Sequence, residues 1–429
     1  MRRSLLLFPF FLLSGWLFPV LLSAAEGSPL RAGPVVLYAV PREAGVWLEL
    51  APGSTARLLY WKRGQPDQTR TSDPVTVFPA GDTTAVLQAT DLEPGTPYEY
   101  AILLGEEPVL LPFRTGWVTP PAMENRPSPP TFDFLALPGQ HPPDPGLDPP
   151  HQTTGFSEDL LLFAADQRPA FVLWPGNTHR IRESDLGADS GILRKIRHTR
   201  LHPQLRPLLA QSPQYAVPGP ADFGPRQTGP GSYDFLRSRE GFQKAWHPRE
   251  QLRWGDVDFF FLDTMQERDP LRKTILSEDA IEALIRRLLR SDASFKIIVS
   301  GTPLLHPAAA YPALAEHESA LEAFLSALRR YPVDGLFFIS GGFAQTELTK
   351  RIRPNRYPLY ELSLAAPGAA RPTNYFREPG TADPGPNFAW FRLENQAGNR
   401  ILGCTLYDAD GSPIWTMQWT PDTLSGKGP

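Results

Sequence analysis

Three stretches of the chain place polar side chains directly after an apolar run, where loops of an α/β sheet commonly carry chemistry. They are Trp174–Glu183 (WPGNTHRIRE), Tyr215–Gly224 (YAVPGPADFG) and Ile339–Glu347 (ISGGFAQTE). A hydrolytic centre with two cations needs about five to seven hard ligands, one of them a bridging carboxylate. These loops supply fewer, because Gly, Pro and Ala separate their polar residues. The pattern predicts loops that follow buried strands and carry few side chains able to serve as hard metal ligands.

The order and spacing of these stretches resemble the alkaline phosphatase D family of calcineurin-like metallophosphoesterases. Members of that family carry W-L-G-D-N-x-Y-x-R-E, Y-A-x-W-D-D-H-D-F-G and x-x-G-D-R-H-x-T-E at the matching places. The similar framework runs roughly from Thr131 to Trp419 and includes Arg253–Asp263 (RWGDVDFFFLD). No single motif survives whole, so the resemblance rests on order and spacing together. It implies a metallophosphoesterase-like layered α/β sandwich.

The resemblance also implies that the substitutions fall on ligand positions. Asn177 stands where the family has the bridging Asp, and a neutral amide is a poor substitute for a bridging carboxylate. Arg180 stands where the family has Tyr, and its fixed positive charge would repel a metal ion. We therefore expect no catalytic residues and no metal site. The degenerate positions are Gly139, Asn177, Thr178, Arg180, Gly219, Pro220, Ala221, Asp222, Gly342 and Ala344.

Other residues offer little to rebuild a metal centre. Asn177, Asp222 and Glu347 remain as candidate ligands. His198 and His202 have the i, i+4 spacing of a zinc pair on a helix, but no third ligand is near in sequence, which favours a polar surface pair. The sequence predicts no cofactor, and Fe, Zn or Ca only if the protein is an active enzyme.

The same loops could instead hold an anion without a metal, since arginine binds phosphate through paired hydrogen bonds. The candidates for this role are His179, Arg180, Arg182, Arg200 and Arg226. The alternative is that these arginines form ion pairs with Glu183, Asp185 and Asp222. The expected partner is then a phosphorylated or other anionic small ligand.

The amino-terminal third of the chain has a different character. Short apolar runs separated by Pro, Gly and Asp predict a small β-sandwich over residues 30–117, similar to fibronectin type III domains. The segment Leu92–Tyr100 resembles the tyrosine corner of such sandwiches. A proline-rich linker is expected at residues 118–130, followed by the α/β domain at 131–421.

Beyond the linker, apolar strands alternate with helical patterns, which favours a sheet covered on both faces. Strands are expected near residues 133–137, 170–174, 214–217, 256–262, 295–299 and 335–339, and helices at 157–166, 203–211, 277–291 and 315–330. Residues 387–419 return to hairpins, and Asp408–Asp410 reads as a turn rather than a calcium loop. The single cysteine, Cys404, lies in an apolar run and is expected in the core.

Residues 1–25 have the features of a cleaved export signal: a basic start, an apolar run and a small-residue cleavage site. Retention as a membrane anchor is the alternative. We therefore expect a secreted, periplasmic or cell-envelope protein with no membrane span after cleavage. The formal charge of −4 and the absence of a basic tract argue against nucleic acid as a partner.

Three functions remain in view. The leading hypothesis is an exported pseudo-phosphatase, similar to alkaline phosphatase D, with a binding or scaffolding role. The first alternative is an active phosphomonoesterase or phosphodiesterase, a phosphoric ester hydrolase with a reduced metal site. The second is a structural envelope protein that contacts another protein through the amino-terminal sandwich.

Overall fold

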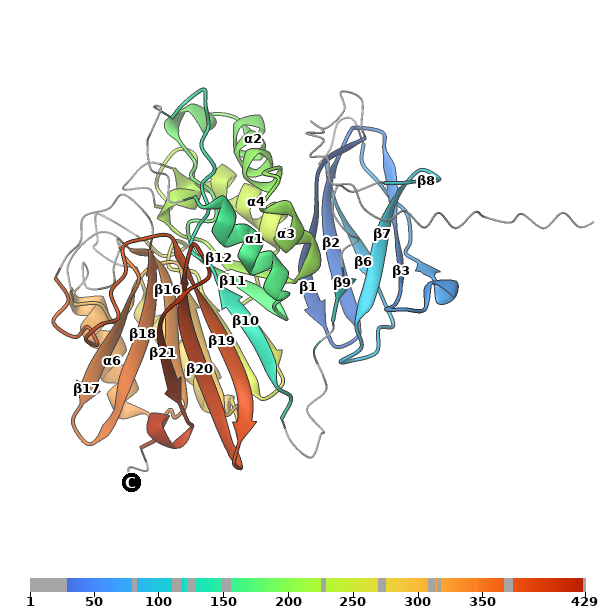
Figure 1. Cartoon of the computed structure of the whole chain (residues 1–429). Coiled ribbons are helices and arrows are strands. Elements are labelled where there is room, and N and C mark those ends of the chain that lie inside the picture. Colours follow the sequence, from blue (N-terminus) through green and yellow to red (C-terminus); the bar gives the residue numbers. More distant parts are fainter. Residues whose placement is uncertain are drawn as a thin grey trace, which may run out of the picture.

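The computed structural model describes residues 29–78, 83–109, 117–119, 121, 129–148, 156–224, 229–268, 275–307, 314, 318–343, 345–365 and 373–426. The chain forms a small β-sandwich, followed by a larger part in which helices flank two sheets (Figure 1). The expected signal segment and most of the expected linker lie outside the described residues. None of the described helices is long and apolar enough to cross a membrane.

The amino-terminal part consists of two antiparallel sheets. One has the order β1-β2-β6; the other has the order β4-β3-β7-β8, with β5 paired to β3 and β9 to β7. The Tyr98 hydroxyl accepts a hydrogen bond from the Glu93 amide at 3.0 Å, as the tyrosine-corner resemblance implies. The strands are β1 (Leu30–Val40), β2 (Glu43–Leu50), β3 (Thr55–Lys62), β4 (Arg70–Thr71), β5 (Val75–Thr76), β6 (Thr84–Ala89), β7 (Tyr98–Leu104), β8 (Glu107–Pro108) and β9 (Trp117–Val118).

The larger part contains two six-stranded sheets, ordered β12-β11-β10-β19-β20-β21 and β13-β14-β15-β16-β18-β17. Strands β10 to β12 are mutually parallel, and so are β14, β15, β16 and β18. The strands are β10 (Phe132–Ala136), β11 (Phe171–Pro175), β12 (Gln214–Val217), β13 (Gln251–Trp254), β14 (Val257–Leu262), β15 (Phe295–Ser300), β16 (Leu336–Phe343), β17 (Glu347–Arg353), β18 (Arg356–Ala365), β19 (Asn387–Gln396), β20 (Asn399–Asp408) and β21 (Pro413–Trp419).

Aromatic side chains fill the space between these two sheets. Phe134 stacks on Phe171 and on Phe391 within the first sheet, with ring centroids 5.1 and 4.7 Å apart. Phe259 of the second sheet meets Phe134 edge-on at 5.2 Å, and Phe337 approaches Phe391 at 5.9 Å. Aromatic pairs add roughly 0.5–1.5 kcal/mol beyond the area they bury, so this layer helps to hold the two sheets together.

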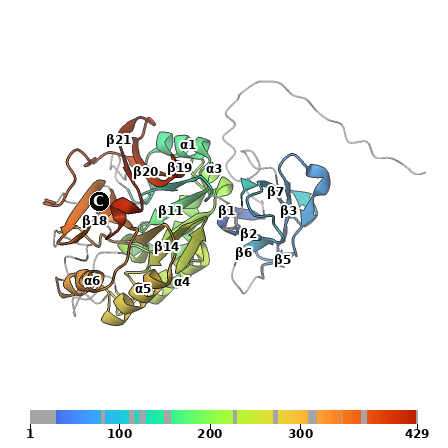
Figure 2. The ribbon, with the colours of Figure 1, turned by 90° about the horizontal axis from the view of Figure 1, so that it is seen from below.

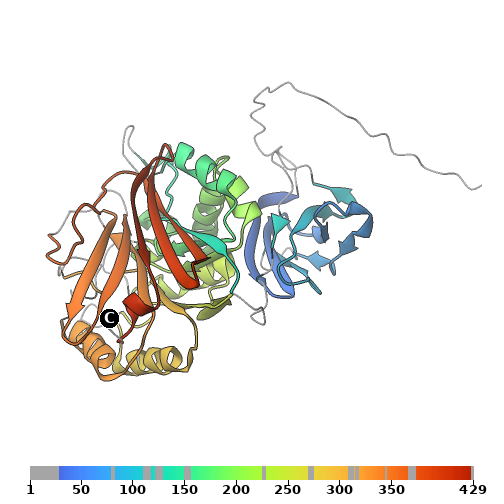
Figure 3. The same cartoon turned by 60° about the horizontal axis from the view of Figure 1, so that its bottom comes forward.

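Helices cover the outer faces of the sheets. Figure 2 shows α1 and α3 on the side of the first sheet and α5 and α6 on the opposite side, beside the second; Figure 3 shows the same order of layers from a second angle. The helices are α1 (Glu158–Gln167), α2 (Asp189–Arg200), α3 (Arg206–Gln211), α4 (Phe235–Trp246), α5 (Glu278–Arg290) and α6 (Glu318–Arg330). The expected layered α/β sandwich preceded by a small β-sandwich is confirmed.

The capped helices match the sequence prediction most closely. Ser157 and Ser277 accept amide hydrogen bonds at the starts of α1 and α5, at 3.4 and 3.2 Å. Helix α3 begins three residues later than expected, and α2 and α4 were not predicted. Both missed helices bury polar groups as well as apolar ones, among them Lys195, Arg200 and Ser238. The buried face of each helix therefore does not show in the sequence as a continuous pattern of apolar residues.

The zinc pair, which was the less favoured interpretation of His198 and His202, is not supported by the course of α2. His198 and His202 do not share a helix face, because α2 ends at Arg200. The His202 ring instead packs against Phe156, and its Nε2 lies 3.6 Å from a Glu158 carboxylate oxygen. By contrast, the hairpin turn at Asp408 is confirmed, since its carboxylate accepts the amides of Asp410 and Ser412. Cys404 is buried, as expected.

The sandwich and the larger part share a polar, buried interface on the β1–β2 side. The Tyr215 hydroxyl donates to the carbonyl of Ala39 at 2.8 Å, and the Tyr100 hydroxyl donates to the carbonyl of Ala210 at 2.7 Å. Glu49, 1% exposed, receives both Nε (2.9 Å) and Nη2 of Arg197. These contacts fix the sandwich against α2, α3 and β12 (Figure 1).

Candidate functional site

The predicted loops meet at one edge of the two sheets, because the strands that precede them are parallel within each sheet. The loops after β11 and β12, two of the three stretches that the sequence singled out, meet the loops after β10 and β15 there. The third stretch, 339–347, was expected as a loop, but it begins within β16 and reaches the first residue of β17. Three of the degenerate positions, Gly139, Asn177 and Gly219, are in direct contact there. The structure therefore brings together the degenerate positions on the loops after β10, β11 and β12.

Asn177 is held by the main chain of its neighbours. Its φ of 54° lies in the left-handed region, which asparagine tolerates better than most residues. Its Oδ1 accepts the Ala221 amide at 2.9 Å, and its carbonyl oxygen lies 2.8 Å from Nε2 of His141. The side-chain oxygen of Asn177 is thus already used inside the protein.

Asp222 is also fully engaged. One carboxylate oxygen accepts the Thr178 hydroxyl and the His179 amide, both at 2.7 Å, and the other accepts the Gly219 amide at 2.8 Å. Burial raises the pKa of Asp222 to about 6, although these hydrogen bonds oppose the shift. The residue ties two loops together and has no oxygen turned towards solvent, since it is 3% exposed.

His179 lies beneath this pair and contacts α4. The indole Nε1–H of Trp246 donates to its Nε2 at 3.1 Å. Because that nitrogen accepts, the neutral ring must carry its proton on Nδ1. Burial, helped by the positive charges of Arg200 and Lys195, holds the pKa of His179 well below its usual value. Nδ1 is buried and has no hydrogen-bond partner among the described residues.

The predicted anion-binding arginines are dispersed. Arg182 donates to Asp148 at 2.5 Å, rather than pairing with Glu183, Asp185 or Asp222 through its side chain. Arg200 is 1% exposed and lies between the rings of Trp47 and Trp246, at 4.2 and 4.9 Å. Arg180 is half-buried. Arg226 lies outside the described residues, as does Ala344.

Glu347 belongs to a separate buried network. Its Oε1 lies 2.8 Å from Nε2 of His306 and accepts Nδ2 of Asn374 at 2.7 Å, while its Oε2 accepts Nε2 of Gln345 at 2.8 Å. Burial alone would raise the pKa of Glu347, but these partners outweigh it and the pKa lies below its usual value. Both oxygens are committed to protein groups. Among the described residues, no hydrogen bond or ion pair joins Glu347 to Asn177 or Asp222, the other two residual metal candidates.

Main chain fills the space between the loop ends. A Cβ placed on Gly139 would lie 1.8 Å from the Asn177 carbonyl oxygen, and one on Gly301 would lie 1.9 Å from that of Pro218. A Cβ on Gly341 would lie 1.7 Å from the Pro175 carbonyl oxygen. Real Cβ atoms do not approach so closely, so only glycine permits these contacts. The loops close on one another by backbone packing.

Lys195 is the residue that the sequence did not indicate. It lies on α2 with a relative exposure of 0%, and its Nζ has no hydrogen-bond partner within the described part of the chain. Burial, followed by the charge of Arg182, lowers its pKa. Its charge also lowers the pKa values of His141 and His179. In the sequence it reads as one of several basic residues on a solvated helix, and no local pattern separates it from the rest.

The residues present do not fit a two-metal centre. The oxygens of Asn177, Asp222 and Glu347 are occupied by internal donors, and main chain takes the place between the loops. Among the described residues, no three His, Cys, Asp or Glu side chains are grouped so that they could hold a metal ion. The arrangement can position hydrogen-bond donors, but it offers no set of free oxygen ligands.

Comparisons with known proteins agree with this fold. No family model matches the chain, and no curated protein matches it. The solved structure of PhoD is similar, with a TM-score of 0.74 and 10% identity over 94% of this chain and 92% of that one. At that identity the likeness establishes the fold alone. The chain has a PhoD-like fold over most of its length, and the resemblance inferred from the loops is confirmed at that level.

Two further solved structures are similar at low scores. Vps29 from Chaetomium thermophilum has a TM-score of 0.27 and 13% identity, over 68% of this chain and 99% of that one. The sensor domain of the anti-sigma factor RsgI4 from Pseudobacteroides cellulosolvens has a TM-score of 0.19 and 15% identity, over 24% of this chain and 96% of that one. At these scores neither likeness carries an argument here.

Proposed function

We propose that this chain is a catalytically inactive, phosphatase-like protein that acts by binding. The observation that carries the proposal is the closure of the loops by backbone contacts at Gly139, Gly301 and Gly341. Two divalent ions cannot enter there without separating loops that Asp222 and Asn177 tie together. Catalysis by a metal-bound hydroxide needs open coordination positions, and this arrangement supports none.

We further propose that the buried donors beside these loops bind a small oxyanion such as phosphate. His179 Nδ1–H and Lys195 Nζ are donors that lack acceptors among the described residues. Buried polar groups are nearly always hydrogen-bonded, and an unsatisfied donor often marks the place of a water or an ion. An anion would also offset the positive charge of Lys195, which burial otherwise disfavours.

Calorimetry with inorganic phosphate tests this binding role. We expect millimolar or tighter affinity, weakened at least tenfold (about 1.4 kcal/mol) in Lys195→Met. Lys244→Met, an exposed position on α4, is the matched control and should bind as the parent does. If calorimetry detects no heat of phosphate binding to the parent protein, the proposed anion-binding role is wrong.

Loss of catalysis has its own test. The purified protein should contain no stoichiometric Fe, Zn or Ca and should not hydrolyse aryl phosphate monoesters or diesters. Bound metal together with turnover that disappears on chelation would establish the alternative, an active phosphoesterase with a displaced site. We also propose that the protein is exported, and amino-terminal sequencing of the mature protein would show whether cleavage follows Ala25.

A further inference from the structure

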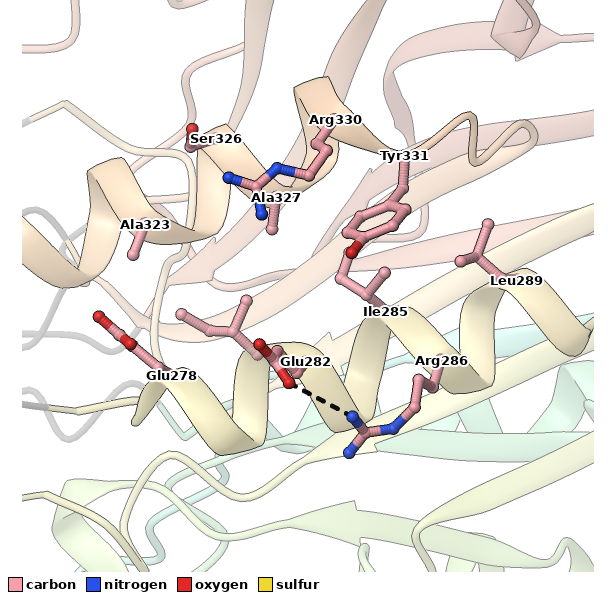
Figure 4. Close-up of a pocket in the computed structure, with 11 residues that line it drawn as sticks. Glu278, Glu282, Ile285, Arg286, Leu289, Ala323, Ser326, Ala327, Arg330 and Tyr331 are labelled. Atoms are coloured by element: carbon pink, nitrogen blue, oxygen red, sulfur yellow. Dashed lines mark hydrogen bonds and ion pairs between the residues drawn. The ribbon is translucent and has the colours of Figure 1, made fainter.

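A hollow of about 480 Å³ lies between α5 and α6, on the opposite side of the two sheets from α1 and α3. Figure 4 shows Ile285, Leu289 and Ala327 along it, with charged side chains at its rim. Leu289 is 45% exposed and Tyr331 is 37% exposed, which is unusual for large apolar side chains that lie side by side. The lining residues are Glu278, Ile281, Glu282, Ile285, Arg286, Leu289, Ala323, Ser326, Ala327, Arg330 and Tyr331.

The two helices give this face opposite charges at its two ends. Strands β14, β15 and β16 are parallel neighbours, and α5 and α6 are the crossovers between them, so the helices run the same way. Each begins with acidic residues, Glu278 on α5 and Glu318 on α6, and each ends with arginines. One end of the face is therefore acidic, the other is basic, and the apolar hollow lies between them.

Two of the rim charges have no ion-pair partner within the part of the chain that the structure describes. Glu282 pairs with Arg286 at 3.4 Å within α5. For Glu278 at the acidic end and Arg330 at the basic end, no ion pair is seen among the described residues, and both side chains are exposed. In Figure 4, Glu278 lies beside Ala323, towards the starts of the helices, and Arg330 lies beyond Ala327, towards their ends.

We infer that this face binds a second copy of the chain. A partner must present the reverse polarity, acidic opposite Arg330 and basic opposite Glu278. The same face turned by a two-fold axis that lies in the face, perpendicular to the line from Glu278 to Arg330, does so, because each copy then contributes the glutamate of one ion pair and the arginine of the other.

The size of the face predicts a weak dimer. Helices of 13 residues are about 20 Å long, and two of them side by side offer roughly 400 Å² per copy. That is about half of the roughly 800 Å² per partner in a standard stable interface. Association should therefore depend on protein concentration and should weaken as salt screens the four charges.

Sedimentation of charge-reversed variants tests the inference. The full-length protein should dimerise between about 10 and 500 µM. Glu278→Arg and Arg330→Glu each place like charges together, and each should weaken self-association at least tenfold. An equimolar mixture of the two variants should restore it, because the mixed dimer regains both Glu–Arg pairs.

Matched controls separate this outcome from damage to the helices. Asp279→Arg removes the same helix-start charge as Glu278→Arg, and Arg329→Glu the same helix-end charge, but neither residue lines the hollow. Both controls should dimerise as the parent does. Tyr331→Ala, a truncation outside the helices, should weaken the dimer without affecting folding. A parent protein that stays monomeric, or variants whose mixture does not recover association, would overturn the inference.

Discussion

At the scale of single residues, the polar side chains of the site bond to other groups of the protein. Asn177, Asp222 and Glu347 are the residues that the sequence left as candidate ligands, and each accepts hydrogen bonds from donors within the chain. These hydrogen bonds join segments that are separate in the chain. Glycine completes the closure, because a hydrogen atom is all that fits between the opposing carbonyl groups.

The glycine contacts lead to a prediction about stability. Gly341→Ala puts a methyl group where the Pro175 carbonyl oxygen lies, so β16 and the loop after β11 must separate. We expect a loss of about 3 kcal/mol or more in the free energy of unfolding, measured by urea denaturation. Gly231→Ala is the control, because no atom lies within 4 Å of its Cβ and it should unfold as the parent does. Equal stability of the two variants would show that the loops can part at little cost.

Asp222 gives a prediction about pH. Its folded pKa of about 6 lies above the usual value of about 3.9, so the folded state binds the proton more tightly than the unfolded state. Its contribution to stability is therefore complete below pH 4 and is lost as pH rises through 6, by up to about 3 kcal/mol. Between pH 4.5 and 7.5 the parent should lose stability relative to Asp222→Asn, whose side chain does not titrate. Parallel curves for the two proteins would contradict the shift.

At the scale of elements, α2 connects the sandwich to the loops. Arg197 pairs with Glu49 on β2, Arg200 lies between Trp47 and Trp246, and Trp246 in turn donates to His179. A continuous set of contacts thus runs from the β-sandwich to the loop that carries Asn177. Lys195 lies on the same helix. A ligand bound at Lys195 and the contact of the sandwich with Arg197 would therefore both affect α2.

The Arg197–Glu49 pair can be tested directly. Arg197→Ala leaves a carboxylate that is 1% exposed without its counter-ion, which should cost about 3 kcal/mol. Adding Glu49→Gln should recover part of that loss, because the buried charge is then removed. Urea unfolding of the single and double variants gives both values. If the double variant is less stable than Arg197→Ala, the pair is not the source of the cost.

At the scale of the whole molecule, side chains of the sandwich and of the larger part bond directly to each other. The interface combines the Arg197–Glu49 pair with hydrogen bonds from Tyr100 and Tyr215 to main-chain carbonyls. The β1–β2 side of the sandwich is occupied within the chain, so any partner of the sandwich must use another face.

This predicts a single unfolding transition. Tryptophan fluorescence and far-UV circular dichroism should give coincident urea curves, since Trp47 of the sandwich and Trp246 of α4 contact the same guanidinium of Arg200. Two separated transitions would mean that the sandwich detaches before the larger part unfolds. In Arg197→Ala, by contrast, we expect the two curves to move apart.

Much of the architecture could be predicted from the sequence. Continuous apolar strands, the Ser157 and Ser277 caps, the hairpin at Asp408 and the buried Cys404 are properties of short segments, and local propensity and periodicity determine them. The absence of carboxylates at most ligand positions was equally visible, since it depends only on residue type. Helices α2 and α4 were missed because their buried faces include polar groups such as Lys195 and Ser238, whose burial depends on distant partners.

The sequence by itself therefore determined the layered sheets and the scarcity of carboxylates on these loops. Only the tertiary structure decided what fills the space between the loops: a carbonyl oxygen of one loop against a glycine of another, and three donors around Asp222. It also decided that Arg200 and Lys195 are buried and that the α5–α6 face has opposite charges at its two ends. The physical reason is that residue types fix local conformation, whereas contacts between segments far apart in the chain exist only once the sheets have formed.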